Sequence, residues 1–164
     1  MSAQLPAALV VDAGFSFTHV VPLVYSPKSV LPKPLLASIR RIDVGGKTLT
    51  NYLMELVSYR SLDLSSEPCV VERLKEDVCF VAQNITKSLQ QPSLLAQTYL
   101  LPDFGEVVRG RVVQAGEDGA GRQTVRVATE RCWVPELLFT PAIAGSCCSN
   151  LFPCLPIFVK LHVY

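Results

Sequence analysis

Residues 9–25 read LVVDAGFSFTHVVPLVY, two apolar runs on either side of a short turn that contains an acidic residue and a glycine. The first run ends at Asp12, and the second begins at Val20, directly after His19. Two β-prone runs joined by a glycine-containing turn are typical of a β-hairpin. We therefore predict a hairpin that exposes an acidic turn.

The turn carries side chains that suit phosphate chemistry. A carboxylate at a strand end, such as that of Asp12, can orient a metal-bound water, and Gly14 lets backbone N–H groups approach a phosphate. His19 could polarise or deprotonate an attacking water if it faces the same side as Asp12. The alternative is that Asp12 and Gly14 serve the tight turn and that His19 is structural. The residues alone leave both interpretations open.

The segment after the hairpin is predicted to form a loop, a short strand and a helix in that order. Residues 26–34 contain three prolines, which favours an irregular surface loop. Residues 36–44 then predict a short strand. After it, apolar residues recur at helical spacing, so we predict a helix with Thr48 as N-cap that runs to about Arg60.

The junction between that strand and that helix reads Gly45-Gly46-Lys47-Thr48, which resembles the end of a phosphate-binding P-loop. The P-loop pattern requires a glycine where Arg41 stands, so this motif is excluded. What remains is a glycine turn before a helix N-terminus. Such a turn can bind an anion through free N–H groups or can simply reverse the chain.

A second helix is predicted to begin at Pro68, a residue that suits the first helical position. Apolar residues at intervals of three and four continue this pattern, and they are Val71, Leu74, Val78, Val81, Ile85 and Leu89. Lys75 and Glu76 fall outside the stripe, on the open side of the helix. There they could meet a base and a ribose hydroxyl, or they could form part of a solvated charged face.

The remaining strands are predicted at residues 99–102, 107–113 and 124–134, as a β-meander. Five arginines in this region alternate with acidic residues, so the charges largely cancel. We interpret the region as a surface or a protein interface, and not as a nucleic-acid patch. Trp133 and the residues after it are predicted to pack in the core.

The bulk composition fits one packed domain of 164 residues, with 49% hydrophobic residues and a net charge of +1. This charge provides no field for binding nucleic acid or an anionic membrane. No apolar run reaches the length of about 18 residues that a transmembrane helix needs, so we expect a soluble, intracellular protein. Of the six cysteines, none forms a CxxC pair. We predict buried, reduced thiols for Cys69, Cys79 and Cys132, and no metal site.

Taken in order, five segments resemble the second half of the actin family. They are residues 10–22, 42–53, 71–81, 101–103 and 129–139. The resemblance implies the α/β class, with a partial actin-type ATPase domain at residues 5–141 made of a mixed sheet and flanking helices. Residues 142–164 do not resemble the family and are interpreted as a divergent apolar tail, produced by splicing or by a gene-model error.

Several short segments are more similar to one nuclear class of actin-related proteins than to filament-forming actin. They are residues 44–47, 58–60, 75–79 and 134–136. That class belongs to nuclear remodelling complexes that exchange a histone variant into nucleosomes. The resemblance implies a non-catalytic structural subunit of such a complex, in the nucleus and secondarily in the cytoplasm, whose partners are protein subunits and histones. An ATP-binding actin-like cytoskeletal protein and a non-functional truncated isoform are the alternatives.

By the same resemblance, Asp12, Gly14, His19, Lys75 and Glu76 form a degenerate ATP site. The family's second acidic residue in the hairpin is replaced by Phe15 and its next glycine by Ser16, which removes a carboxylate and a flexible backbone position. The family's first phosphate hairpin and its adenosine loop are expected outside this sequence. We therefore expect no catalysis and no cofactor here, and ATP binding only in a full-length form. We also expect the isolated chain to have poor stability.

Overall fold

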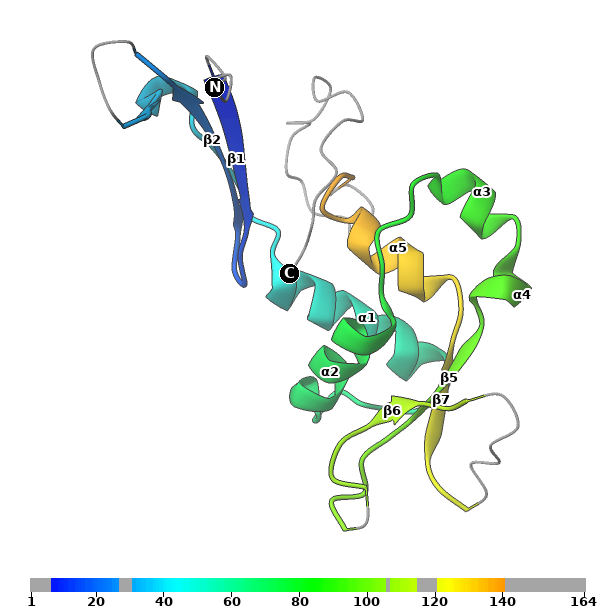
Figure 1. The fold of residues 1–164 in the computed structure, drawn as a ribbon. Coiled ribbons are helices and arrows are strands. Elements are labelled where there is room, and N and C mark those ends of the chain that lie inside the picture. The colour runs from blue at the N-terminus through cyan, green and yellow to red at the C-terminus, as the bar shows by residue number, and fades with distance from the viewer. Residues whose placement is uncertain (1–6, 27–30, 106, 115–120, 141–164) are drawn as a thin grey trace.

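The computed structural model describes residues 7–26, 31–105, 107–114 and 121–140 of the chain (Figure 1). The described residues form two small sheets joined by a group of packed helices. The divergent tail predicted for residues 142–164 lies outside the described residues, as do residues 27–30 of the proline-rich loop.

The predicted hairpin is confirmed, and it belongs to a four-stranded antiparallel sheet. The strands are β1 (Ala7–Ala13), β2 (Thr18–Val24), β3 (Lys33–Pro34) and β4 (Arg40–Ile42). β2 pairs with β1 along one edge and with both β3 and β4 along the other. One turn of 3-10 helix at Leu36–Ser38 occupies the beginning of the segment where a longer strand was predicted.

The helix after the glycine turn is α1 (Gly46–Arg60), and it ends where the sequence predicts. Its N-cap is Gly45, so the prediction of Thr48 as N-cap is wrong. Thr48 lies inside the first turn of the helix. The helix begins earlier because only a residue without a side chain can approach the hairpin as closely as Gly45 does.

The second helix, α2 (Pro68–Val78), starts at the predicted proline but does not continue to Leu89. The predicted long helix is replaced by α2, a break, and two short helices, α3 (Ile85–Leu89) and α4 (Pro92–Leu95). Tertiary hydrogen bonds compete with the helix at the break, because the side chain of Arg131 donates to the carbonyl of Val78 at 2.8 Å. Asn84 then caps α3 by accepting from the N–H of Lys87 at 3.0 Å.

The second sheet has three antiparallel strands, β5 (Gln97–Leu100), β6 (Arg111–Val112) and β7 (Thr124–Val127). β5 lies in the middle and pairs with both of the others, so the predicted meander is wrong. The last predicted strand ends at Val127, and a helix, α5 (Glu130–Glu136), follows it. Where a mixed sheet was expected, the strand pairings in the described part of the chain are all antiparallel.

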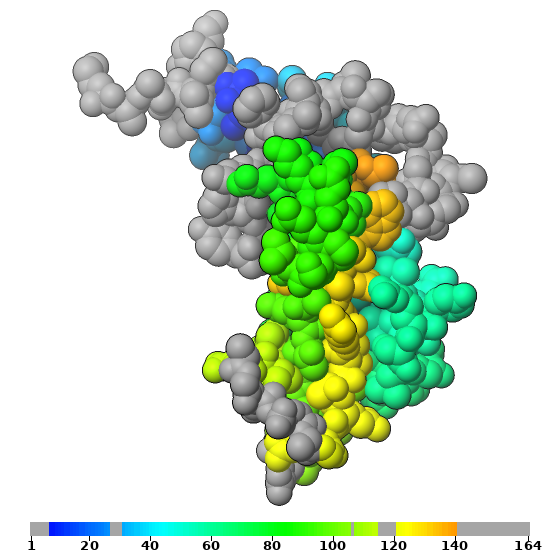
Figure 2. All heavy atoms as spheres, turned by 90° about the vertical axis from the view of Figure 1, so that its right-hand side faces the viewer, coloured from blue at the N-terminus to red at the C-terminus, as the bar shows by residue number. Residues whose placement is uncertain are grey.

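The core lies where α1, α2 and α5 pack against β5 and β7. Its most deeply buried large side chains are Leu53, Val71, Leu74, Tyr99, Val125, Val127, Val134 and Leu137. Figure 2 shows β7 and α5, in yellow and orange, between α1 in teal and the green segment of α3, α4 and β5. Trp133 lies at the edge of this core and donates from its indole nitrogen to the hydroxyl of Tyr52 at 3.1 Å. By contrast, most of β1 is exposed.

Candidate functional site

The turn of the β1–β2 hairpin lies directly on the N-terminus of α1 (Figure 1). The N–H of Gly14 donates to the carbonyl of Phe17 at 3.0 Å and closes the turn. The carbonyls of Gly14 and Phe15 accept from the N–H groups of Gly46 and Lys47, at 3.0 and 2.8 Å. Two of the helix amides that have no partner within α1 are thereby bound to the hairpin.

Gly45 is the residue that makes this contact possible. A Cβ atom at position 45 would lie 2.7 Å from each of three backbone atoms, the carbonyl oxygens of Gly14 and Phe15 and the nitrogen of Phe17. Real Cβ atoms do not approach backbone that closely, so any other residue would push the hairpin away. The sequence left open whether the glycine turn binds an anion through free N–H groups or only reverses the chain. The structure favours chain reversal. The amides of Gly46 and Lys47 hold the chain's own carbonyls.

Asp12 and His19 are brought together. They are directly opposite each other in the β1–β2 register, and His19 is opposite Arg41 in the β2–β4 register. Opposite residues of antiparallel strands project from the same face, so these three side chains form a row across the sheet. The ring of His19 meets the ring of Phe17 edge to face, with centroids 4.9 Å apart.

Arg41 completes the polar end of this row. Its guanidinium lies 4.1 Å from the centroid of the Phe17 ring, and its Nε contacts the Asp43 carboxylate at 2.8 Å. The neighbouring Thr18 projects from the opposite face, where its hydroxyl donates to the carbonyl of Val44 at 2.8 Å. Thr18 therefore joins the sheet to the entry of α1, whereas His19 stays on the other face.

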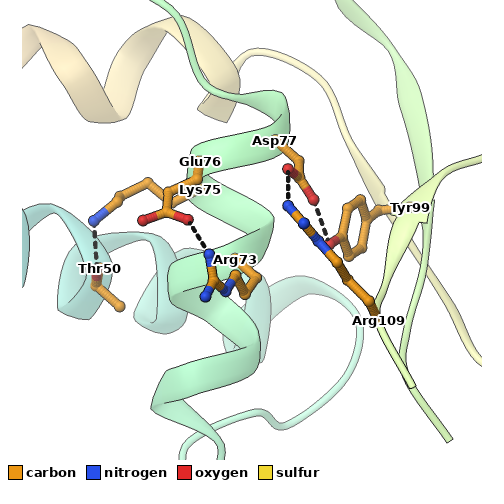
Figure 3. Close-up of polar contacts among 7 residues, drawn as sticks. All are labelled: Thr50, Arg73, Lys75, Glu76, Asp77, Tyr99 and Arg109. Carbon is orange, nitrogen blue, oxygen red and sulfur yellow. Dashed lines mark hydrogen bonds and ion pairs between the residues drawn. The ribbon is translucent and has the colours of Figure 1, made fainter. Parts of the chain in front are cut away.

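Lys75 and Glu76 are neighbours in sequence, but their side chains bind different partners (Figure 3). The ammonium group of Lys75 reaches α1, where it donates to the carbonyl of Gly46 at 3.2 Å and to the hydroxyl of Thr50 at 2.9 Å. Glu76 is exposed and pairs with Arg73 at 2.9 Å. The prediction that both side chains lie on the open side of α2 holds for Glu76 and is wrong for Lys75.

Gly46 lies between Lys75 and the turn of the hairpin. A Cβ atom at this position would lie 3.7 Å from Lys75 Nζ and 3.7 Å from the Cα of Phe15. The structure thus brings Lys75 and the Gly14 turn to the same end of α1. Glu76 does not join this group, because its side chain turns toward Arg73.

Thr50 and Asp77 are two contact residues that the sequence reasoning missed. Thr50 is buried and also donates to the carbonyl of Gly46, one helical turn earlier, at 3.0 Å. Asp77 accepts from the hydroxyl of Tyr99 at 2.8 Å, and burial followed by this hydrogen bond raises the pKa of Tyr99 well above its usual range. No pattern in the sequence singles out Thr50. The position of Asp77 beside the apolar stripe of α2 was the available signal.

The three described cysteines are free thiols. Cys132 is buried and Cys79 is half-buried, whereas Cys69 is exposed, so the prediction of a buried thiol at Cys69 is wrong. Burial raises the pKa of Cys79 to about 12. Cys69 is exposed because it lies in the first turn of α2, off the stripe that faces the core.

The described residues offer neither a metal site nor a membrane-spanning helix. They contain no group of three or more His, Cys, Asp or Glu side chains arranged to hold a metal ion. None of the helices described is both long enough and apolar enough to cross a membrane.

Comparison with known proteins identifies the class to which this fold and this hairpin belong. The sequence model of the actin family matches residues 2–150. The chain therefore belongs to the actin family.

Its relatives narrow the resemblance within that family. The chain is 45% identical over 146 residues to actin-related protein 6 of Drosophila melanogaster, an alignment that covers 84% of this chain and 35% of that protein. It is 41% identical over 143 residues to actin-like protein ARP6 of Yarrowia lipolytica, covering 85% and 35%. Actin-related protein 6 of Arabidopsis thaliana is 34% identical over 181 residues, covering 93% and 42%. The resemblance to actin-related protein 6 is thus confirmed, and the chain spans between a third and a half of the length of these relatives.

Proposed function

We propose that the chain is a non-catalytic, structural actin-related subunit of a nuclear chromatin-remodelling complex that exchanges a histone variant. Its partners are the other protein subunits of that complex and histones. It contacts neither nucleic acid nor membrane directly. The chain's similarity to proteins named actin-related protein 6 supports the class of protein. The geometry of the hairpin supports the structural role.

The main support for the structural role is that the first amides of α1 bind carbonyls of the hairpin. The N–H groups of Gly46 and Lys47 bind the carbonyls of Gly14 and Phe15, and so they act as an internal joint between sheet and helix. Lys75 adds a third connection to the same helix end. These donors are the ones that a phosphate would need at a helix N-terminus, and here they hold protein to protein.

Phe15, which stands where the family has an acidic residue, also supports the structural role. Phe15 is 60% exposed at the hairpin tip, where it brings no carboxylate to orient a metal-bound water. An aromatic side chain at this place favours contact with protein or packing over phosphate chemistry.

The second candidate function, ATP binding in a full-length actin-like protein, has one specific observation in its favour. Asp12 and His19 share a face of the hairpin, as an acid and a base around an attacking water would. Lys75 lies at the α1 end of the same hairpin. Glu76, which would meet the ribose, turns away toward Arg73.

The two candidates are separated by a pair of measurements on the tagged chain. Purification from nuclei tests the structural role, which predicts co-purification with remodelling subunits. Equilibrium dialysis against Mg-ATP, with the chain and with a longer version that includes the rest of an actin fold, tests the alternative. Saturable Mg-ATP binding that is lost in Asp12→Asn and kept in Asp43→Asn would support the second candidate over the first.

A further inference from the structure

A groove of about 310 Å³ lies on the side of the molecule formed by α2 and the loop between β5 and β6. Its lining contains no residue of the hairpin or of the candidate ATP site, although Arg73 in the lining pairs with Glu76. The lining residues that matter here are Val70, Arg73, Pro102, Phe104, Val108 and Arg109. Most of this lining is apolar, with an arginine from each side.

The loop that forms one wall is fixed in place by its own hydrogen bonds. The carboxylate of Asp103 accepts from the N–H groups of Gly105 and Val107 at 2.9 and 2.8 Å, and the N–H of Asp103 donates to the carbonyl of Val107 at 3.0 Å. At the far end, Gly110 is pressed against Tyr99, where an added Cβ would lie 2.5 Å from the ring. The described residues of this wall are thus held by hydrogen bonds within the chain.

The described part of this loop presents two large apolar side chains to water. Phe104 is 71% exposed and Val108 is 73% exposed. Phe104 also has a φ of 56°, a left-handed conformation that is unfavourable for an aromatic residue. A strained backbone that holds an aromatic side chain in solvent is unfavourable for the isolated chain, and binding would offset that cost.

Among the described residues, each of the two arginines of the groove pairs with one carboxylate. Arg73 pairs with Glu76 at 2.9 Å, and Arg109 makes a longer contact of 3.5 Å with Asp77, which already accepts from Tyr99. A guanidinium carries five N–H donors, so each arginine can bind a further carboxylate. Figure 3 shows Arg73 turned toward Glu76 and Arg109 turned toward Asp77.

We propose that this groove binds a segment of a partner protein in which an apolar side chain is flanked by carboxylates. The apolar side chain packs between Phe104, Val108 and Val70, and the carboxylates bind Arg73 and Arg109. An aromatic residue beside arginines is the composition of interface residues that dominate binding. A second copy of this chain fits the groove less well, because a two-fold contact would bring the same arginines toward each other. The inference deepens the proposed function, since a structural subunit acts through surfaces of this kind.

The test selects peptides from a phage-displayed library of random twelve-residue sequences on the immobilised full chain. We expect enriched peptides to carry an aliphatic or aromatic residue next to Asp or Glu. A synthetic copy of the most enriched peptide should bind roughly tenfold more weakly to Phe104→Asn and to the double variant Arg73→Gln with Arg109→Gln. Asparagine tolerates a positive φ, so Phe104→Asn should keep the fold.

Matched controls are Leu94→Asn on α4, where the leucine is 76% exposed, and Arg40→Gln on β4. Both should bind the peptide as the unaltered chain does. Failure to enrich any peptide, enrichment of basic peptides, or equal binding by Phe104→Asn would overturn the proposal. A concentration-dependent dimer that Phe104→Asn abolishes would assign the groove to a second copy and overturn it as well.

The peptide-selection test of the groove and the co-purification test of the proposed function can fail independently. A chain that co-purifies with remodelling subunits but selects no acidic peptide overturns the groove alone. A chain that selects such peptides but co-purifies with no remodelling subunit overturns the proposed function alone.

Discussion

The backbone N–H of Phe80 donates a hydrogen bond to the carbonyl of Arg131 at 3.0 Å. Within α5 the carbonyl of Arg131 has no helical donor, because the residue four positions later is Pro135, which lacks an N–H group. The side chain of Arg131 in turn donates to the carbonyl of Val78, at the end of α2. The segment just after α2 therefore binds a carbonyl of α5, and a side chain of α5 binds a carbonyl at the end of α2.

Replacing Arg131 with methionine should lower the free energy of unfolding by roughly 1–3 kcal/mol. The guanidinium donates to the carbonyls of Val78 and Leu95, both at 2.8 Å, and methionine leaves both without this donor. Urea unfolding of the two proteins measures the difference. Arg126→Met, at an exposed position of β7, is the control and should change little. Equal losses for the two variants would contradict this account of the helix break.

Replacing Gly45 with alanine should destabilise the hairpin joint by about 1–3 kcal/mol, the range found for overpacked sites. The cause is the contact of 2.7 Å that the new Cβ would make with three backbone atoms. Gly105→Ala is the matched control, because its nearest neighbour would be a side-chain oxygen at 3.8 Å. Amide hydrogen exchange at Gly46 and Lys47 should speed up in Gly45→Ala and stay unchanged in Gly105→Ala. Unaltered exchange in Gly45→Ala would contradict the joint.

Replacing Lys75 with methionine distinguishes a structural lysine from a nucleotide ligand. If the ammonium group joins α2 to α1 through Gly46 and Thr50, the free energy of unfolding should fall by about 1 kcal/mol. Lys87→Met, at an exposed position of α3, should leave stability unchanged. Unaltered stability in Lys75→Met, together with weaker Mg-ATP binding, would favour the nucleotide role instead.

Stability should fall as the pH rises above about 9, in part because of Cys79. Burial raises the pKa of this thiol to about 12 in the folded chain, from a value of 9.0 in the absence of structure. Between these values the unfolded chain loses a proton that the folded chain keeps, which favours unfolding. The loss attributable to one such group is at most about 1.4 kcal/mol per pH unit.

Urea unfolding at several pH values between 8 and about 11 measures that slope. Cys79→Ala should flatten it, whereas Cys69→Ala, which removes an exposed thiol, should not. Buried Tyr99, whose pKa is also raised, should contribute above pH 10, so Tyr99→Phe should flatten the upper end. A slope that is identical in Cys79→Ala and the unaltered chain would rule out the contribution of Cys79.

Local pattern predicts the parts of this fold whose hydrogen bonds are local. The hairpin, the beginning of α2 and the end of α1 follow from alternation, from Pro68 and from helical spacing. The break after Val78 could not be predicted, because the groups that compete with the helix come from Arg131, more than fifty residues later. The central place of β5 depends likewise on pairings between distant strands.

The sequence pattern indicates candidate residues for the site, but it does not show how their side chains are arranged. Asp12 and His19 lie on one face because hairpin register is set by the turn. Sequence does not show which way Lys75 turns, since the groups that attract it, Gly46 and Thr50, belong to another helix. It also does not show that Gly45 approaches the hairpin backbone, which depends on how the sheet meets α1.

The structural role within a remodelling complex is tested most directly by purifying the tagged chain from nuclear extract and identifying its partners by mass spectrometry. The account predicts that subunits of a histone-exchange remodeller co-purify with the chain in fixed proportion and remain bound after depletion of ATP. Purification of the chain without such subunits, or with partners that dissociate when ATP is removed, would contradict it.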